Sequence, residues 1–127
     1  WALTLPLPLF HRNQGQIKEA KALLAKSEKE YQNIVNKLLL LLNQSISMYE
    51  NLLNQVKTYR EKVIPKSEQS LSFITMGYQE GKLNYLELLD AQRTLTETQE
   101  TYIGLIENLN NASIEIERLS GKSIDEL

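Results

Sequence analysis

Two carboxylates three residues apart, Glu87 and Asp90, have the types and spacing that could do chemistry in this sequence. Residues three apart share one face of a helix, so these side chains would lie together. Around a pore built from several copies of the chain, they would form an acidic ring that attracts cations. The structural alternative is that both are solvated, that one pairs with Arg93, and that Asp90 supports the start of a helix. A catalytic pair is disfavoured, because no nucleophile, base partner or walled pocket is apparent nearby.

His11 is the only histidine, and the chain has no cysteine. One histidine without cysteine cannot hold a transition metal by itself, so we expect no metal site and a turn position for His11. The sequence indicates no other cofactor. It also contains no recognisable catalytic motif, which predicts that the chain is not an enzyme. The net charge of −2 gives no electrostatic reason to expect nucleic acid as a partner.

The elements that must position the carboxylates are predicted to be mostly helical. Leucine, glutamate, lysine, asparagine and glutamine fill long stretches, and 127 residues amount to about one domain. The chain starts at Trp1 without a signal-type segment, which indicates a piece cut from a longer protein. The run of five leucines at 38–42 is far too short to span a membrane as a helix.

Residues 1–10, WALTLPLPLF, carry leucines at alternate positions, the pattern of a short β-strand with one apolar face. Pro6 and Pro8 each remove a hydrogen-bond donor from the ladder, so this strand should lie at the end or edge of a sheet. Residues 11–15 are predicted to turn the chain into a helix.

Two long helices are predicted to follow. Residues 16–76 contain no glycine and keep an apolar stripe, which predicts one very long helix with a kink caused by Pro65, near residues 62–64. Residues 84–119 predict a second helix that packs like a coiled coil, and 120–127 form a polar tail. The heptad positions of the second helix are occupied by Leu88, Ala91, Leu95, Thr98, Tyr102, Leu105, Leu109, Ala112, Ile116 and Leu119.

Between the two helices, residues 77–83 are predicted to form the turn of a long antiparallel α-helical hairpin. Gly77 and Gly81 should let the backbone reverse there. The arms are unequal, because the second helix can cover only part of the first, and the apolar stripe of residues 16–40 has no partner in this chain. The five leucines point all round the helix, so at least two neighbours are implied.

The order of these segments resembles a known family. LPLPLF followed by RNQG, a long helix, GYQEGKLNYLELLDAQRTL and a second helix ending in ERLSG are similar to the TolC-type outer-membrane efflux channel family. The heavy-metal efflux branch, with CzcC-like and CusC-like proteins, matches most closely. The resemblance covers nearly the whole chain and corresponds to the C-terminal half of such a protein.

The resemblance implies a homotrimer in a Gram-negative bacterium, with a β-barrel in the outer membrane and an α-helical tunnel through the periplasm. Residues 1–10 would be the end of a barrel strand, 16–76 the long tunnel helix and 84–119 the helix that returns from the periplasmic tip. The tip would dock onto a periplasmic adaptor (membrane fusion) protein, which connects the duct to an inner-membrane efflux pump. Metal ions or drugs would pass through.

The resemblance also suggests which residues act at the tip. Some family members carry a basic residue at the position of Leu83, which ties neighbouring hairpins closed, and a small apolar residue at the position of Glu80, so this chain departs from the pattern twice. The acidic ring at the pore entrance would be formed by Glu87 and Asp90. Tyr78, Gly81 and Asp90 match the tip pattern of the family. Because they lie at the end of the hairpin, the residues predicted to form the adaptor-docking tip are Tyr78, Glu80, Gly81, Lys82 and Leu83.

A different class of function remains open from the residues alone. A coiled-coil scaffold that forms no channel, or an adaptor-type helical hairpin, would have the same two helices. Neither alternative requires the proline-marked strand of residues 1–10. A matching repeat upstream in the full-length chain would distinguish a channel from a scaffold.

Overall fold

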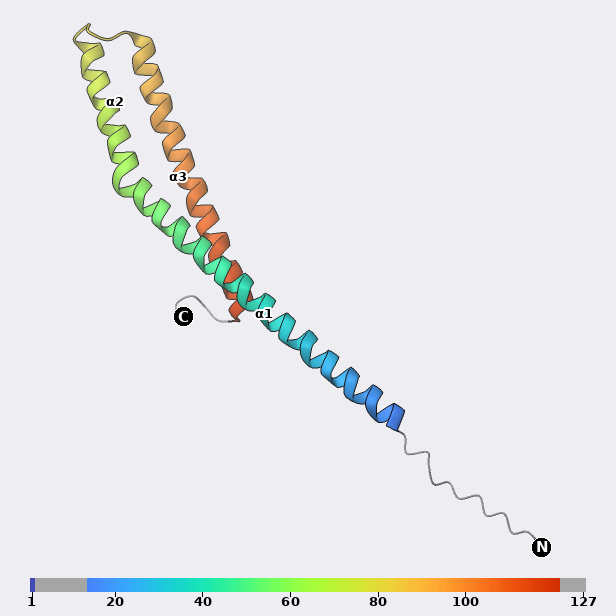
Figure 1. The fold of residues 1–127 in the computed structure, drawn as a ribbon. Helices are drawn as coiled ribbons and strands as arrows, with labels where there is room; N and C mark the ends of the chain where they lie inside the picture. Colours follow the sequence, from blue (N-terminus) through green and yellow to red (C-terminus); the bar gives the residue numbers. More distant parts are fainter. Residues whose placement is uncertain (2–13, 122–127) are drawn as a thin grey trace. The chain divides into compact units, whose positions relative to one another are not determined.

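The structure, a computed structural model, describes Trp1 and residues 14–121. The predicted strand of residues 1–10, His11 and the tail beyond Gly121 lie outside the described residues. The mostly α-helical fold class is confirmed for the described part (Figure 1). Its elements are α1 (Gln14–Thr58), the π-helix η1 (Tyr59–Val63), α2 (Ile64–Gln79) and α3 (Tyr85–Ser120). The chain divides into two compact units, residues 1–39 and residues 40–127.

Apart from Trp1, the described part of the first unit is the N-terminal stretch of α1, residues 14–39. Its apolar stripe is exposed, and the side chains that form it keep between 49% and 69% of their surface accessible: Ile17, Leu23, Leu24, Tyr31, Ile34, Leu38 and Leu39. Only Val35 is half-buried. Although the stretch is rich in leucine, no described helix is both long enough and apolar enough to cross a membrane.

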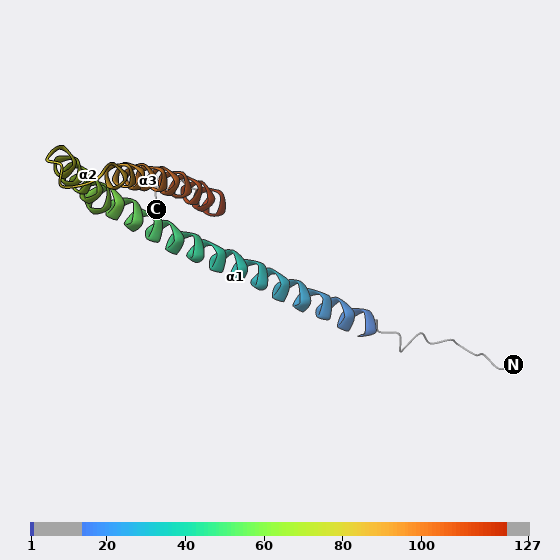
Figure 2. The same ribbon diagram turned by 90° about the horizontal axis from the view of Figure 1, so that it is seen from above.

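The second unit contains the predicted helical hairpin. From residue 40 the chain runs through the end of α1, η1 and α2 to a turn, and α3 returns antiparallel beside α2 (Figures 1 and 2). Every heptad residue predicted for the returning helix is buried or half-buried, which confirms that this helix packs along one stripe.

The tightest packing of the hairpin lies away from its turn. The buried side chains of the described residues are Leu52 and Val56 of α1 and Ala112 and Ile116 of α3. They lie at similar numbers of residues from the turn on the two arms, which indicates that the arms pack against each other there. In η1 and α2, by contrast, no residue is buried.

The outgoing arm is not the single α-helix predicted over 16–76, because η1 interrupts it directly before Pro65. Proline has no backbone N–H and its ring clashes with the carbonyl four residues back, at Glu61. In η1 the Ile64 N–H donates to the carbonyl of Tyr59, five residues back, which is the wider π-helical turn. The predicted kink is therefore seen as a π-helical segment, and the ribbon changes direction here (Figure 1).

The spacing of inward-facing residues explains why one turn is widened. From Tyr49 to Val63, the buried and half-buried positions of the outgoing arm alternate steps of three and four residues, as in a heptad. Val63 and Ile64 are both half-buried, and the steps of three and four then continue from Ile64 to Ser67 and Leu71, so the pattern has shifted by one residue. The arm thus contains one residue more than its heptad needs, and the π-helical turn absorbs this residue.

Candidate functional site at the hairpin tip

The backbone of the tip is closed by a regular C-terminal cap. Gly81 has a φ of 71°, in the left-handed region that favours glycine. Its N–H donates to the carbonyl of Tyr78 (3.0 Å), and the Lys82 N–H donates to the carbonyl of Gly77 (2.9 Å). This pair of bonds is the Schellman motif, which ends a helix with a left-handed residue that is usually glycine. One glycine is therefore enough to end α2 and start the reversal.

Gly77 has a different role from the one predicted, because it lies inside α2 and does not reverse the chain. A Cβ atom at this position would lie 2.6 Å from Cδ1 of Leu83, well below an ordinary contact distance. The half-buried Leu83 side chain thus packs directly onto the backbone of Gly77. Glycine is needed here for a close approach between the end of α2 and the turn.

Gly77→Ala is expected to destabilise the hairpin, because the added methyl group overlaps Leu83 and overpacking costs about 1 to 3 kcal/mol. The matched control is Gly104→Ala in α3, where an added Cβ meets no atom within 4 Å. That change should stabilise by about 0.5 to 1 kcal/mol, as usual for glycine in a helix. Thermal melts of both variants measure the difference. Equal melting temperatures would contradict the close approach at Gly77.

The side chains of the predicted docking tip are mostly exposed. Glu80 and Lys82 form an ion pair across the turn, with 2.6 Å between Oε2 and Nζ. The ring of Tyr78 lies 6.2 Å from that of Tyr85, at an interplanar angle of 57°. Tyr78, Glu80, Gly81 and Lys82 are accessible, whereas Leu83 is half-buried. Four of the five predicted docking residues thus form the outer surface of the tip, and Leu83 supports it from inside.

Glu87 has a structural role that the sequence reading missed. Its carboxylate accepts a hydrogen bond from the Asn84 N–H (2.8 Å), and the Asn84 Oδ1 accepts one from the Glu87 N–H (2.9 Å). This capping box satisfies two backbone donors at the start of α3. The signal was present, because asparagine followed three residues later by glutamate is a typical helix start.

Arg93 does not form the ion pair with Glu87 or Asp90 that the alternative of two solvated carboxylates included. Nε of Arg93 lies 2.7 Å from Oε1 of Glu97, one turn further along α3. Among the described residues, Arg93 forms no ion pair with Glu87 or Asp90. The hydrogen bond from Arg93 to Glu97 raises the pKa of the Arg93 guanidinium, and the charge of Asp90 contributes less. Within the described residues Asp90 forms no ion pair. Its side chain is exposed.

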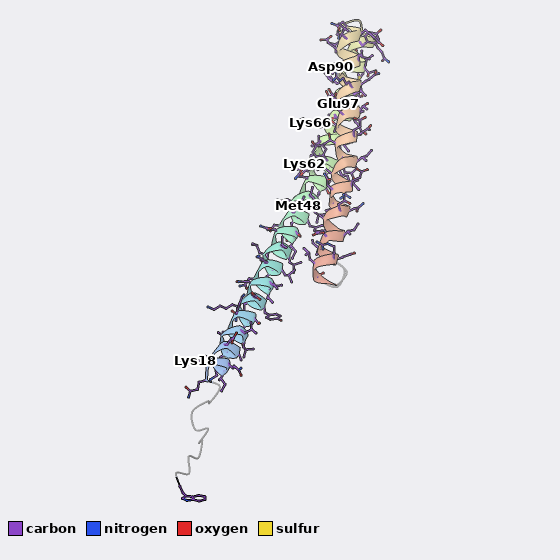
Figure 3. The ribbon with its side chains drawn as sticks, turned by 90° about the vertical axis from the view of Figure 1, so that its right-hand side faces the viewer. Lys18, Met48, Lys62, Lys66, Asp90 and Glu97 are labelled. Carbon is purple, nitrogen blue, oxygen red and sulfur yellow. The ribbon has the colours of Figure 1, made fainter. Side chains whose placement is uncertain are left out.

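Glu87 and Asp90 line one open groove between the two arms, with a volume of about 630 Å³. The opposite wall carries Lys62 and Lys66, which lie further from the tip (Figure 3). The remaining lining residues are mostly small or aliphatic: Val63, Ser67, Ser70, Ile74, Leu83, Ala91 and Thr94. Among the described residues, no group of three or more histidine, cysteine, aspartate or glutamate side chains is placed to hold a metal ion.

Comparison with known proteins shows which family the sequence matches. Residues 1–122 match the family model described as outer membrane efflux protein. The cobalt-zinc-cadmium resistance protein CzcC of Cupriavidus metallidurans (strain CH34) is 35% identical over 124 residues, which cover 94% of this chain and 29% of CzcC. The chain therefore spans less than a third of the length of this relative. No solved structure matches the chain.

Proposed function

The chain belongs to the outer membrane efflux protein family, and from this premise we propose that it is the C-terminal repeat of a trimeric efflux duct. The duct carries substrates from an inner-membrane pump and a periplasmic adaptor to the outside of a Gram-negative cell. Family members are channel proteins and not enzymes, which confirms the expectation that the chain is not an enzyme. The match over residues 1–122 is the observation that carries the proposal.

The tip of the hairpin is proposed as the surface that docks onto the adaptor. Support comes from its geometry: a hydrogen-bonded turn presents Tyr78, Glu80, Gly81 and Lys82 outward at the end of two helices. Leu83 holds the turn against Gly77 and acts from inside. A polar, exposed turn is suited to a contact with another protein and does not have the enclosed shape of a catalytic site.

Divalent metal cations are the proposed substrates. The supporting observation is the similarity to a relative whose name states cobalt, zinc and cadmium resistance. The test is deletion of the full-length gene in its host, followed by growth in graded concentrations of each metal. Deletion should lower the tolerated concentration and raise the metal content of the cells, and the intact gene should reverse both. Unchanged tolerance and metal content would contradict the proposal.

The proposed acidic ring of Glu87 and Asp90 can be tested apart from the capping box. Glutamine also serves at the third position of a capping box, so Glu87→Gln should keep the helix start and lose only the charge. Combined with Asp90→Asn, it should lower the cation selectivity of the full-length trimer in a planar bilayer and leave its melting temperature nearly unchanged.

The control for this experiment is Asn84→Ala, which removes the cap and keeps both carboxylates. It should cost about 1 kcal/mol of stability and leave cation selectivity intact. If the charge-neutral double variant conducts cations as well as the unaltered protein, Glu87 and Asp90 do not form a ring at the pore.

A further inference from the structure

The tip half of the hairpin is held together more weakly than the rest. All the buried side chains of the described residues lie on the far side of η1 from the tip, in α1 and α3. Neither η1 nor α2 buries a residue. Local stability follows the number of buried apolar contacts, so the segment from η1 to the turn belongs to the least stable part of the hairpin.

Polar interactions do not compensate for this loose packing. Beyond the turn, the described structure has no hydrogen bond and no ion pair between α2 and α3, because each such side-chain contact joins residues at most four positions apart. The ring contact of Tyr78 with Tyr85 lies at the tip itself. Between the tip and η1, an open groove lined by Ser67, Ser70, Ala91 and Thr94 runs along the two helices, which remain neighbours.

The loosely packed segment ends, on the side away from the tip, at the π-helix η1. The Ile64 N–H reaches back five residues to Tyr59, and Pro65 has no N–H with which to complete an α-helical turn at Glu61. A π turn within an α-helix is rare and is frequently found at functional positions. Hinges are commonly a few such residues that absorb a change of backbone direction.

We propose that η1 is a hinge on which α2 swings toward and away from α3, with the Schellman turn as its second pivot. The groove then exists in a wider and a narrower form, while the packed region around Leu52 and Ala112 stays fixed. This inference concerns motion within one chain and does not rest on the proposed substrate or on docking to an adaptor.

The test is a distance measurement between spin labels in a cysteine-free version of the full-length protein. Ser70→Cys and Thr94→Cys place labels on the two walls of the groove. Asn54→Cys and Asn111→Cys, both exposed, place a reference pair on the packed region. Labelled protein is diluted into unlabelled protein, so that distances within one chain dominate.

The groove pair should give a distance distribution about twice as wide as that of the reference pair, or two separate peaks. One narrow peak for the groove pair would overturn the hinge. Deleting Arg60 together with Pro65→Ala removes the extra residue and the proline, and should narrow the groove distribution to that of the reference pair. The control is Arg60→Ala, which keeps the chain length and should leave the distribution broad.

A groove distribution that stays broad after the deletion would overturn the assignment of the hinge to η1. If the deletion variant does not fold, Pro65→Ala alone serves in its place and should still narrow the distribution. Metal tolerance of cells that produce these variants is measured separately. A failure of the hinge proposal and a failure of the duct proposal therefore give different results.

Discussion

Gly81→Trp at the hairpin tip is expected to abolish metal resistance in cells that depend on the full-length protein, while the trimer still reaches the outer membrane. No atom lies within 4 Å of a Cβ built at Gly81, so an indole there would point away from the hairpin and block a docking partner. The strain of a non-glycine residue in the left-handed region is about 1 to 2 kcal/mol, which affects the turn and leaves the packed region intact.

The matched control is Gly81→Ala, which carries the same backbone strain without the bulk. It should retain most of the resistance, and crosslinking to the adaptor should persist with alanine and be lost with tryptophan. Full metal resistance with tryptophan at this position would contradict the proposal that the tip docks onto the adaptor. Failure of both variants to reach the outer membrane would show that Gly81 is needed for folding, which also contradicts the expected result.

The second large effect is expected from the exposed apolar residues of α1, from Ile17 to Leu41. The chain of 127 residues should associate with itself or bind a hydrophobic dye, because the exposed leucines are each worth about 1.5 to 3 kcal/mol when buried. Leu38, Leu39, Leu40 and Leu41 are between 48% and 58% exposed. Sedimentation at increasing protein concentration, together with dye fluorescence, measures the effect.

Polar substitution of the stripe, with Ile34→Gln, Leu38→Gln and Leu41→Gln, should remove most of the association and the dye signal. The control changes three polar residues of the same helix, with Asn33→Gln, Asn36→Gln and Asn43→Gln, and should change neither. A strictly monomeric unaltered chain that binds no dye would contradict the expectation that another surface covers this stripe.

The returning helix was the most predictable part of the fold. Its heptad runs without interruption from Leu88 to Leu119, so one period describes which side the helix buries. Its start could also have been predicted to the residue from the pair Asn84 and Glu87. Its end is capped by Gly121, which has a φ of 68°.

The outgoing arm was predicted less well, for an identifiable reason. An apolar stripe tolerates steps of three and of four residues. The one extra residue between Val63 and Leu71 therefore does not visibly disturb the helical pattern of the sequence. Pro65 indicated a distortion, and the choice between a kinked α-helix and a π turn depends on how the surrounding backbone bonds rearrange.

Two details of the site depend on side-chain contacts that spacing cannot determine. Arg93 has acidic neighbours at suitable helical distances on both sides, Asp90 and Glu97, and only the side-chain conformations select Glu97. Gly77 could equally have been a turn residue, and its role follows from where Leu83 packs after the chain has reversed.

The extra residue in η1 has a consequence for how sequences in this family should be aligned. An insertion confined to one widened turn leaves the positions before and after it on their original faces, so related chains can gain or lose it without rebuilding the tip. We therefore expect relatives that are one residue shorter between the equivalents of Tyr59 and Leu71 to have an uninterrupted α-helix. The gap in such an alignment belongs inside the helix, where gap placement would ordinarily be avoided, and not in the turn of residues 80–84.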